Sequence, residues 1–186
     1  MCMPYVNATM RAYYDIQMVG DEIVSCVKPF DLAEVEIRDG VRWTPAFKIA
    51  IQLNVLGSRD LQNRVNPITN GDTLVFRLNM TQYADNAEGR NSAVLDFFER
   101  KIELEDCDKA CFEFYNETRI VPVPQMKLPE GKGKFALKLF IMRRPKGVEL
   151  EELRNSEKYS IQTMKQLEFV EDIRTAGRKS KTTKKI

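Results

Sequence analysis

The chain has 186 residues, of which 43% are hydrophobic and 30% charged. This length suits one domain, and the composition excludes wholesale disorder. The formal net charge is only +2, but all 27 acidic residues precede position 174, so residues 1–173 carry a net charge of −4 and residues 174–186 carry +6. We therefore divide the chain into a single domain, residues 1–173, and a basic C-terminal tail, residues 174–186. The mildly acidic domain is a poor electrostatic partner for nucleic acid.

The N-terminal third predicts three strands, at residues 5–19, 22–30 and 33–39, from its β-branched and aromatic residues. On a strand Tyr13 and Tyr14 point to opposite faces, so one of them is expected to be exposed. Exposed aromatic residues are typical of interfaces. Trp43 suits either a core anchor or an interface, because it combines a large apolar ring with a polar N–H group.

The central segments 47–55 and 71–83 predict half-buried strands, because apolar residues occupy every second position in both. In the second segment Arg77 falls on the polar face and is expected to point outward. The apolar residues of the two segments are Phe47, Ile49, Ile51, Leu53 and Val55, followed by Leu74, Phe76, Leu78 and Met80.

The next segment, residues 91–104, is predicted to be a helix. Val94, Phe98 and Ile102 are spaced four apart, and Asn91 or Ser92 is available as an N-cap. Weaker strand patterns follow at residues 109–117 and 119–126.

Two segments with proline or glycine shape the predictions after residue 118. Pro122 and Pro124 cannot donate to a ladder, which favours a sheet edge or a bulge for residues 119–126. The segment 128–134 contains Pro129, Gly131 and Gly133 and predicts a hairpin connection.

Residues 134–144 predict another strand, with Phe135, Leu137, Leu139 and Ile141 on its core face. Its second face is unusually apolar because it carries Phe140 and Met142, so we expect that face to meet a partner. A short helical turn is predicted at residues 147–155 and a last strand at residues 158–170. We expect an all-β fold, an antiparallel β-sandwich of seven to nine strands with one or two short helices. The layout resembles C2-type or immunoglobulin-like sandwiches over most of the chain, without a diagnostic motif, so no residue role follows from it.

The sequence contains no histidine, which excludes Ser-His-Asp and Cys-His nucleophiles and zinc sites that use imidazole. Residues 103–111 combine acidic residues with Cys107 and Cys111. They lack the glycine and the distal glutamate of a calcium loop, and no further ligands complete a zinc site. We expect no catalytic residue, no metal site and no cofactor, and no small-molecule substrate is evident.

No stretch is apolar for long enough to span a bilayer, and the first residues lack the basic and apolar segments of a signal peptide. The four cysteines are too few for a disulfide scaffold. We therefore expect a protein of the cytoplasm or of a virion, which is not secreted.

Three functions remain from different classes. The first is a non-enzymatic structural or interaction subunit of a larger viral or bacterial assembly, which docks or self-associates through apolar strand surfaces and the tail. The second is a nucleic-acid-associated protein whose tail contacts phosphates, with salt-sensitive binding. The third is a histidine-independent enzyme that uses carboxylates or a thiol near residues 103–111. We favour the first, with candidate contact residues Tyr13, Tyr14, Trp43, Phe140, Met142, Arg174, Arg178, Lys179, Lys181, Lys184 and Lys185.

Overall fold

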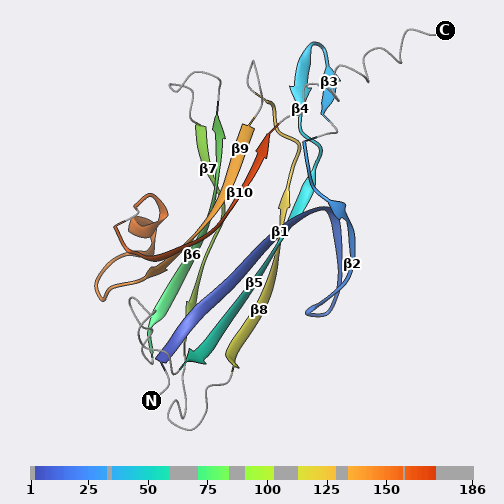
Figure 1. Ribbon diagram of the computed structural model, residues 1–186. Helices are drawn as coiled ribbons and strands as arrows, with labels where there is room; N and C mark the ends of the chain where they lie inside the picture. Colours follow the sequence, from blue (N-terminus) through green and yellow to red (C-terminus); the bar gives the residue numbers. More distant parts are fainter. Residues whose placement is uncertain are drawn as a thin grey trace, which may run out of the picture.

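The computed structural model describes residues 3–32, 35–58, 71–83, 91–102, 113–128, 134–156 and 158–170. Over these residues the protein is mostly β (Figure 1). It has two four-stranded antiparallel sheets, neither closed into a barrel, and a separate two-stranded hairpin. The prediction of an all-β protein with antiparallel sheets is confirmed.

The first sheet has the strand order β2-β1-β5-β8, and the second has the order β10-β9-β6-β7. The first sheet consists of β1 (Met3–Val19), β2 (Glu22–Pro29), β5 (Phe47–Ser58) and β8 (Glu113–Val123). The second consists of β6 (Thr73–Tyr83), β7 (Asn91–Lys101), β9 (Lys134–Arg143) and β10 (Ser160–Val170). The separate hairpin is β3 (Glu36–Arg38) with β4 (Val41–Trp43), and a short 3₁₀ helix, η1, spans Leu150–Arg154.

The main core lies between the two sheets, and the alternation along each strand explains which residues fill it. On β5 the buried residues Phe47, Ile49, Ile51 and Leu53 occupy every second position. The same alternation buries Leu74, Phe76 and Leu78 on β6 and Phe135, Leu137, Leu139 and Ile141 on β9. Each such side chain contributes roughly 1.5–3 kcal/mol by leaving water, which makes this cluster the main source of stability.

The predicted helix at residues 91–104 is wrong, because β7 covers Asn91–Lys101 and pairs with β6. A spacing of four residues places side chains on one face of a helix, but it does the same on a strand, where the period is two. Phe98 accordingly stacks on Phe76 in the core, with ring centroids 5.0 Å apart. A register shift opposite Leu78 and Asn79 interrupts the strict alternation that would have identified the strand.

The helical turn predicted at residues 147–155 is present as η1, and it accounts for the apolar second face of β9. Phe140 and Met142 are 4% and 0% exposed. Met142 packs with Val75 of β6 and Leu153 of η1. The expectation that Phe140 and Met142 contact a partner is therefore corrected: both are buried within this chain, Met142 against η1 and Phe140 beside the guanidinium group of Arg77.

Arg77 points to the outer side of β6, as predicted, but it is buried beneath the same segment. Its Nη1 atom donates hydrogen bonds to the carbonyl oxygens of Leu153, at 2.7 Å, and Ser156, at 3.1 Å. Its guanidinium group lies 4.6 Å from the centre of the Phe140 ring. Arg77 thus ties the β9–β10 connection to the second sheet.

Two predictions around β8 also change. Residues 109–117 and 119–126 were expected to form separate strands, whereas Glu113–Val123 is one strand. It lies at the edge of the first sheet, as the prolines predicted. The hairpin connection predicted at residues 128–134 lies mostly outside the described residues, and the strands before and after it, β8 and β9, belong to different sheets.

Candidate interaction surface

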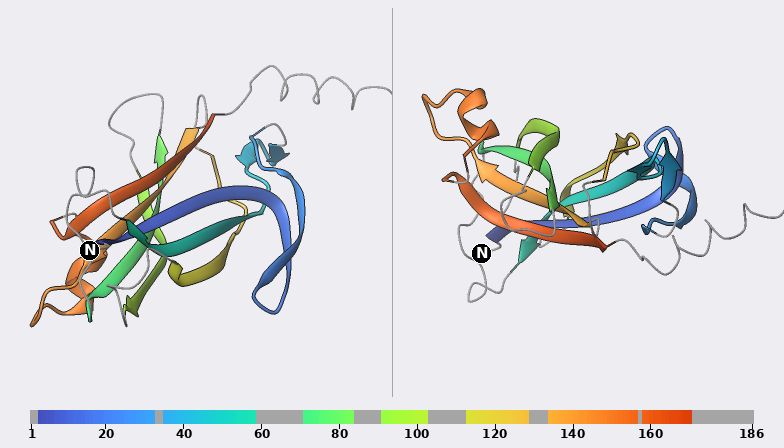
Figure 2. Two further views of the ribbon diagram at one scale, coloured as in Figure 1. Left: turned by 60° about the horizontal axis from the view of Figure 1, so that its bottom comes forward. Right: turned by 90° about the horizontal axis from the view of Figure 1, so that it is seen from above.

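The second part of strand β1 extends beyond β5 and pairs with β2 alone. The strand pairs with β5 from Met3 to Tyr13 and with β2 from Tyr13 to Val19. Residues 14–29 therefore form a two-stranded ribbon beyond the body of the sheet, which we call the projecting ribbon. Its curved course is visible in both views of Figure 2. Gly20, with φ of 61°, and Asp21 make the two-residue turn at its tip.

The base of the projecting ribbon is anchored in the core by Phe30. The chain bends at Lys28, whose φ of 21° is rarely adopted by L residues, and Phe30 then enters the space between the sheets. The Phe30 ring stacks on Phe47 at a centroid distance of 3.9 Å and meets Phe169 of the second sheet at 5.0 Å. The Phe30 N–H also donates to the carbonyl oxygen of Ala12 at 3.0 Å.

Lys48 of β5 holds the first strand of the ribbon where it bends away. Its Nζ atom lies 2.8 Å from Oδ1 of Asp15 and donates to the carbonyl oxygen of Ile16 at 3.3 Å. The hydrogen bond from Lys48, together with one from the Ile16 N–H group, lowers the pKa of Asp15. Tyr14 adds a third link, because its hydroxyl group donates to Asp31.

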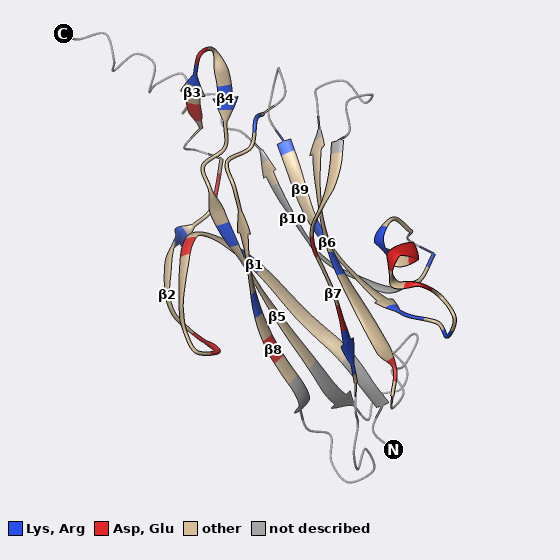
Figure 3. Ribbon diagram, turned by 180° about the vertical axis from the view of Figure 1, so that it is seen from behind, with Lys and Arg blue, Asp and Glu red and all other residues tan. Residues whose placement is uncertain are grey.

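The ribbon exposes apolar side chains that the rest of the described surface rarely shows. Val19 is 70% exposed, Val24 57% and Val27 47%. Among the described side chains, Ile37 of β3 is the one other large hydrophobic residue with comparable exposure. Between Glu22 and Lys28 the strand reads Ile-Val-Ser-Cys-Val and carries no charge, so β2 is tan between its charged ends in Figure 3.

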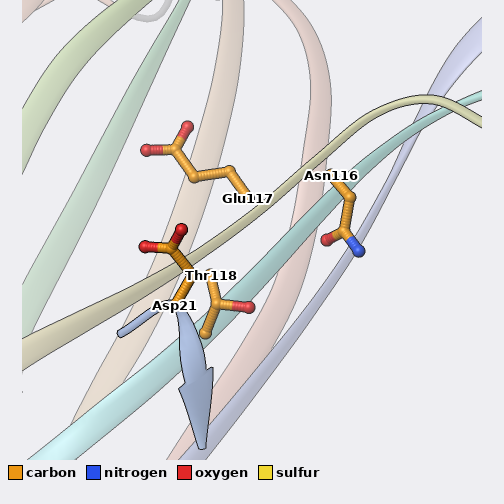
Figure 4. A pocket seen from close by; sticks show the side chains of 4 residues that line it. All are labelled: Asp21, Asn116, Glu117 and Thr118. Carbon is orange, nitrogen blue, oxygen red and sulfur yellow. The ribbon is translucent and has the colours of Figure 1, made fainter. Parts of the chain in front are cut away.

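Two shallow hollows lie beside the ribbon. A cavity of about 210 Å³ is lined from three strands of the first sheet, by Thr9, Arg11 and Tyr13 of β1, Ile23 and Cys26 of β2, and Ala50 and Gln52 of β5. A second, of about 300 Å³, lies where the ribbon tip approaches β8 and is lined by Asp21, Asn116, Glu117 and Thr118 (Figure 4). The ribbon therefore arches over the outer face of the first sheet and leaves room beneath it.

The edges formed by β7 and β8, one from each sheet, have a different character. Arg100 of β7 binds both carboxylate oxygens of Glu117 at 2.6 and 2.8 Å, and Arg119 of β8 binds both oxygens of Asp96 at 2.9 and 3.0 Å. The Phe98 ring lies between the two guanidinium groups, at 4.9 Å from Arg100 and 3.8 Å from Arg119. We call the four charged residues the edge clasp, since they join the sheets along this side.

The residues predicted to contact partners lie in different environments in the structure. Tyr13 lines the smaller hollow, whereas Tyr14 packs against the core and binds Asp31. The half-buried Trp43 stacks under the Arg38 guanidinium group at 4.8 Å, in the β3–β4 hairpin. The tail residues Arg174, Arg178, Lys179, Lys181, Lys184 and Lys185 lie outside the described residues, as do Cys107 and Cys111.

Sequence reasoning identified β2 as a strand but did not predict that Val24 and Val27 are exposed. The available signal was the run of five uncharged residues between two charged ones. Sequence alone does not tell whether such a strand is central or at an edge.

Within the described residues, no helix is both long and apolar enough to cross a membrane, and no group of three or more Cys, Asp or Glu side chains could hold a metal ion. The chain matches no protein-family model, no curated protein and no solved structure.

Proposed function

We propose that this protein is a non-enzymatic β-sandwich interaction subunit that binds another polypeptide along the outer edge of β2, the edge away from β1. An edge strand presents a row of backbone N–H and C=O groups, to which an extended segment can add as a further strand. The observation that carries the proposal is the uncharged, β-branched sequence of β2 on a ribbon whose valines are exposed.

The anchoring of the ribbon supports this role. Phe30 and Lys48 fix its base through stacking and hydrogen bonds, so the strand is presented in an ordered conformation. A preordered strand loses less conformational entropy on binding than a flexible segment, which favours affinity. The exposed Val24 and Val27 of β2 then offer apolar contacts beside the backbone pairing.

The contrast between edges also supports the choice of β2. β8 carries Pro122 within its strand, and the edge clasp places charged side chains along β7 and β8. Prolines and inward-pointing charges are the features that keep sheet edges from pairing with other chains. In β2 the charges and the proline are confined to the ends of the strand, at Glu22, Lys28 and Pro29, although the pairing with β1 skips Val24 as a bulge.

The basic tail supports a second candidate function, nucleic-acid binding, beside this proposal. Residues 174–186 carry six positive charges and no acid, which suits contacts with nucleic-acid phosphates. Deletion of residues 174–186 is expected to abolish any salt-sensitive gel shift, and an unchanged shift would exclude the tail as its cause.

The experiment places a photo-reactive benzophenone amino acid at position 24 of the full chain in its host cells. Because the Val24 side chain sits beside the proposed pairing edge, irradiation should give a discrete cross-linked product. The matched control carries the same group in place of Lys146, an exposed residue in the β9–β10 connection. The product should also disappear when Val27→Lys adds a charge to β2. Equal cross-linking at positions 24 and 146, or none at either, would overturn the proposal.

A further inference from the structure

We infer that the outer face of the first sheet, beneath the projecting ribbon, binds a neutral oligosaccharide. This site goes beyond the proposed function, because its ligand lies under the ribbon and not along the outer edge of β2. The two hollows beside the ribbon carry the inference, since their walls combine hydroxyl, amide and carboxylate groups with a tyrosine ring. We call the two hollows together the sheet-face site.

The two hollows adjoin on one row of paired residues across the sheet. Thr9 of β1 pairs with Gln52 of β5, and Gln52 pairs with Thr118 of β8. Thr9 and Gln52 line the smaller hollow, and Thr118 lines the larger one. Neighbouring strands lie about 4.8 Å apart, so this row joins the two hollows over about 10 Å. An elongated ligand can therefore occupy both hollows.

The floor of the sheet-face site consists of uncharged polar side chains. The Thr9 hydroxyl group donates to Oε1 of Gln52 at 3.3 Å, which orders this part of the row. In the adjacent row Asn7 pairs with Asn54, and Asn54 pairs with Asn116, so three amide side chains lie across the same three strands. Hydroxyl and amide groups each donate and accept hydrogen bonds, which matches the hydroxyl groups of a sugar.

A small residue and a β-bulge shape the smaller hollow. Ala50, which pairs with Arg11, contributes only a methyl group to the outer face and so leaves depth there. The pairing of β1 with β2 skips Val24, and this bulge turns Ile23 and Cys26 toward the same hollow. On a regular strand these two side chains would point to opposite faces. The smaller hollow therefore has a polar floor and an apolar side provided by the ribbon.

A sugar ring matches this combination of surfaces. Its hydroxyl groups lie around the edge of the ring, whereas its two faces carry C–H groups. The edge can form hydrogen bonds with Thr9 and Gln52, while a face packs against Ile23 and the Tyr13 ring. Small-molecule sites commonly combine apolar walls with a few polar groups that fix the orientation of the ligand.

The larger hollow suits the next sugar of the same chain. It is lined by Asp21 at the ribbon tip and by Asn116, Glu117 and Thr118 of β8 (Figure 4). The Glu117 carboxylate is already bound by Arg100, whereas a carboxylate such as that of Asp21 can accept hydrogen bonds from two adjacent hydroxyl groups. The two acids also repel phosphate, sulfate and carboxylate groups. The site therefore favours a neutral ligand.

The first test applies the purified full chain to an array of oligosaccharides built from glucose, mannose, galactose, xylose and N-acetylglucosamine. Neutral members should be bound, and their sulfated or sialylated counterparts should bind more weakly. The strongest neutral member is then titrated into ¹⁵N-labelled protein, where the amide signals of Gln52 and Thr118 should shift and that of Thr81, on the second sheet, should not. A chain that binds no neutral member, or prefers the acidic ones, would refute the inference.

The second test changes the two hollows one at a time. Ala50→Leu fills the smaller hollow and Thr118→Ala removes a hydroxyl group from the larger one, so each should weaken binding about ten-fold. Thr81→Ala is the matched control, because it removes a hydroxyl group from the outer face of the second sheet. Asp21→Ala, at the exposed ribbon tip, replaces Ala50→Leu if that variant does not fold. Unchanged affinity in Thr118→Ala and Asp21→Ala would rule out the sheet-face site.

A polar hexapeptide library is the competing probe, because peptide groups also bind amide and hydroxyl side chains. Shifts of Gln52 and Thr118 with peptides but with no oligosaccharide would exclude a sugar as the ligand. The result is independent of the cross-linking experiment at position 24. Sugar binding without a cross-linked product would leave the sheet-face site and remove the β2 edge as a binding site, and a cross-linked product without sugar binding would do the reverse.

Discussion

The β7 and β8 edges and the β2 edge are built in opposite ways. On β7 and β8, charged residues occupy positions that face the opposite sheet, and two bidentate Arg–carboxylate pairs satisfy them. On β2 the middle of the strand is uncharged, and its valines face solvent. The first arrangement connects the sheets of one molecule, whereas the second leaves apolar side chains exposed at a strand edge, which is why we propose that edge as a binding site.

The comparison shows that strand edges of one fold can differ: β7 and β8 are joined by ion pairs, whereas β2 carries exposed apolar side chains. A charged residue at an edge must be solvated or paired, so an incoming strand would have to displace water or break an ion pair. The edge clasp adds this cost along β7 and β8. The projecting ribbon has its polar links at its base, through Asp15 and Lys48, where they leave the outer edge of β2 unobstructed.

The largest expected effect comes from breaking the anchor of the ribbon. Phe30→Ala removes a buried ring that touches both sheets, and it should lower the free energy of unfolding by about 3–5 kcal/mol. Urea denaturation measures this change. Val27→Ala is the control, because an exposed valine should change stability by no more than about 0.5 kcal/mol. Similar values for the two variants would show that the ribbon is not anchored through Phe30.

The edge clasp gives an intermediate effect. Asp96→Lys brings a third cation beside Arg119 and Arg100 and should cost about 2 kcal/mol of unfolding free energy, reduced by the partial exposure of these groups. The exchange Asp96→Arg/Arg119→Asp restores opposite charges and should recover part of the loss. Urea denaturation of the wild type and both variants provides the measurement, and an Asp96→Lys variant as stable as the wild type would mean that the clasp does not join the sheets.

The smallest effect concerns Asp15 at the ribbon base. Its pKa is lower in the folded protein, so its contribution to stability is present above the unfolded value, about 3.9, and is lost as the pH falls through the folded value. NMR titration of the Ile16 amide should show a midpoint below 3.9. Lys48→Met should raise that midpoint toward the ordinary value. A midpoint that Lys48→Met leaves unchanged would contradict the role of the Lys48 hydrogen bond.

The alternation of apolar residues was sufficient to predict β5, β6 and β9, because a half-buried strand selects side chains at every second position. It failed at β7, where a spacing of four residues fits a helix and a strand equally well. The sequence also marked β8 as an edge strand through Pro122, because proline has no backbone N–H group to donate to a neighbouring strand.

The sequence by itself determined that the chain is β-rich, that histidine chemistry is absent, and that positive charge is concentrated in the tail. These properties depend on composition and on local periodicity. The tertiary structure decided which apolar residues are exposed: Met142 is covered by Val75 of β6 and by η1, whereas Val24 and Val27 stay exposed because β1 and β2 extend beyond β5. Burial depends on contacts between residues far apart in sequence, and a local pattern does not contain those contacts.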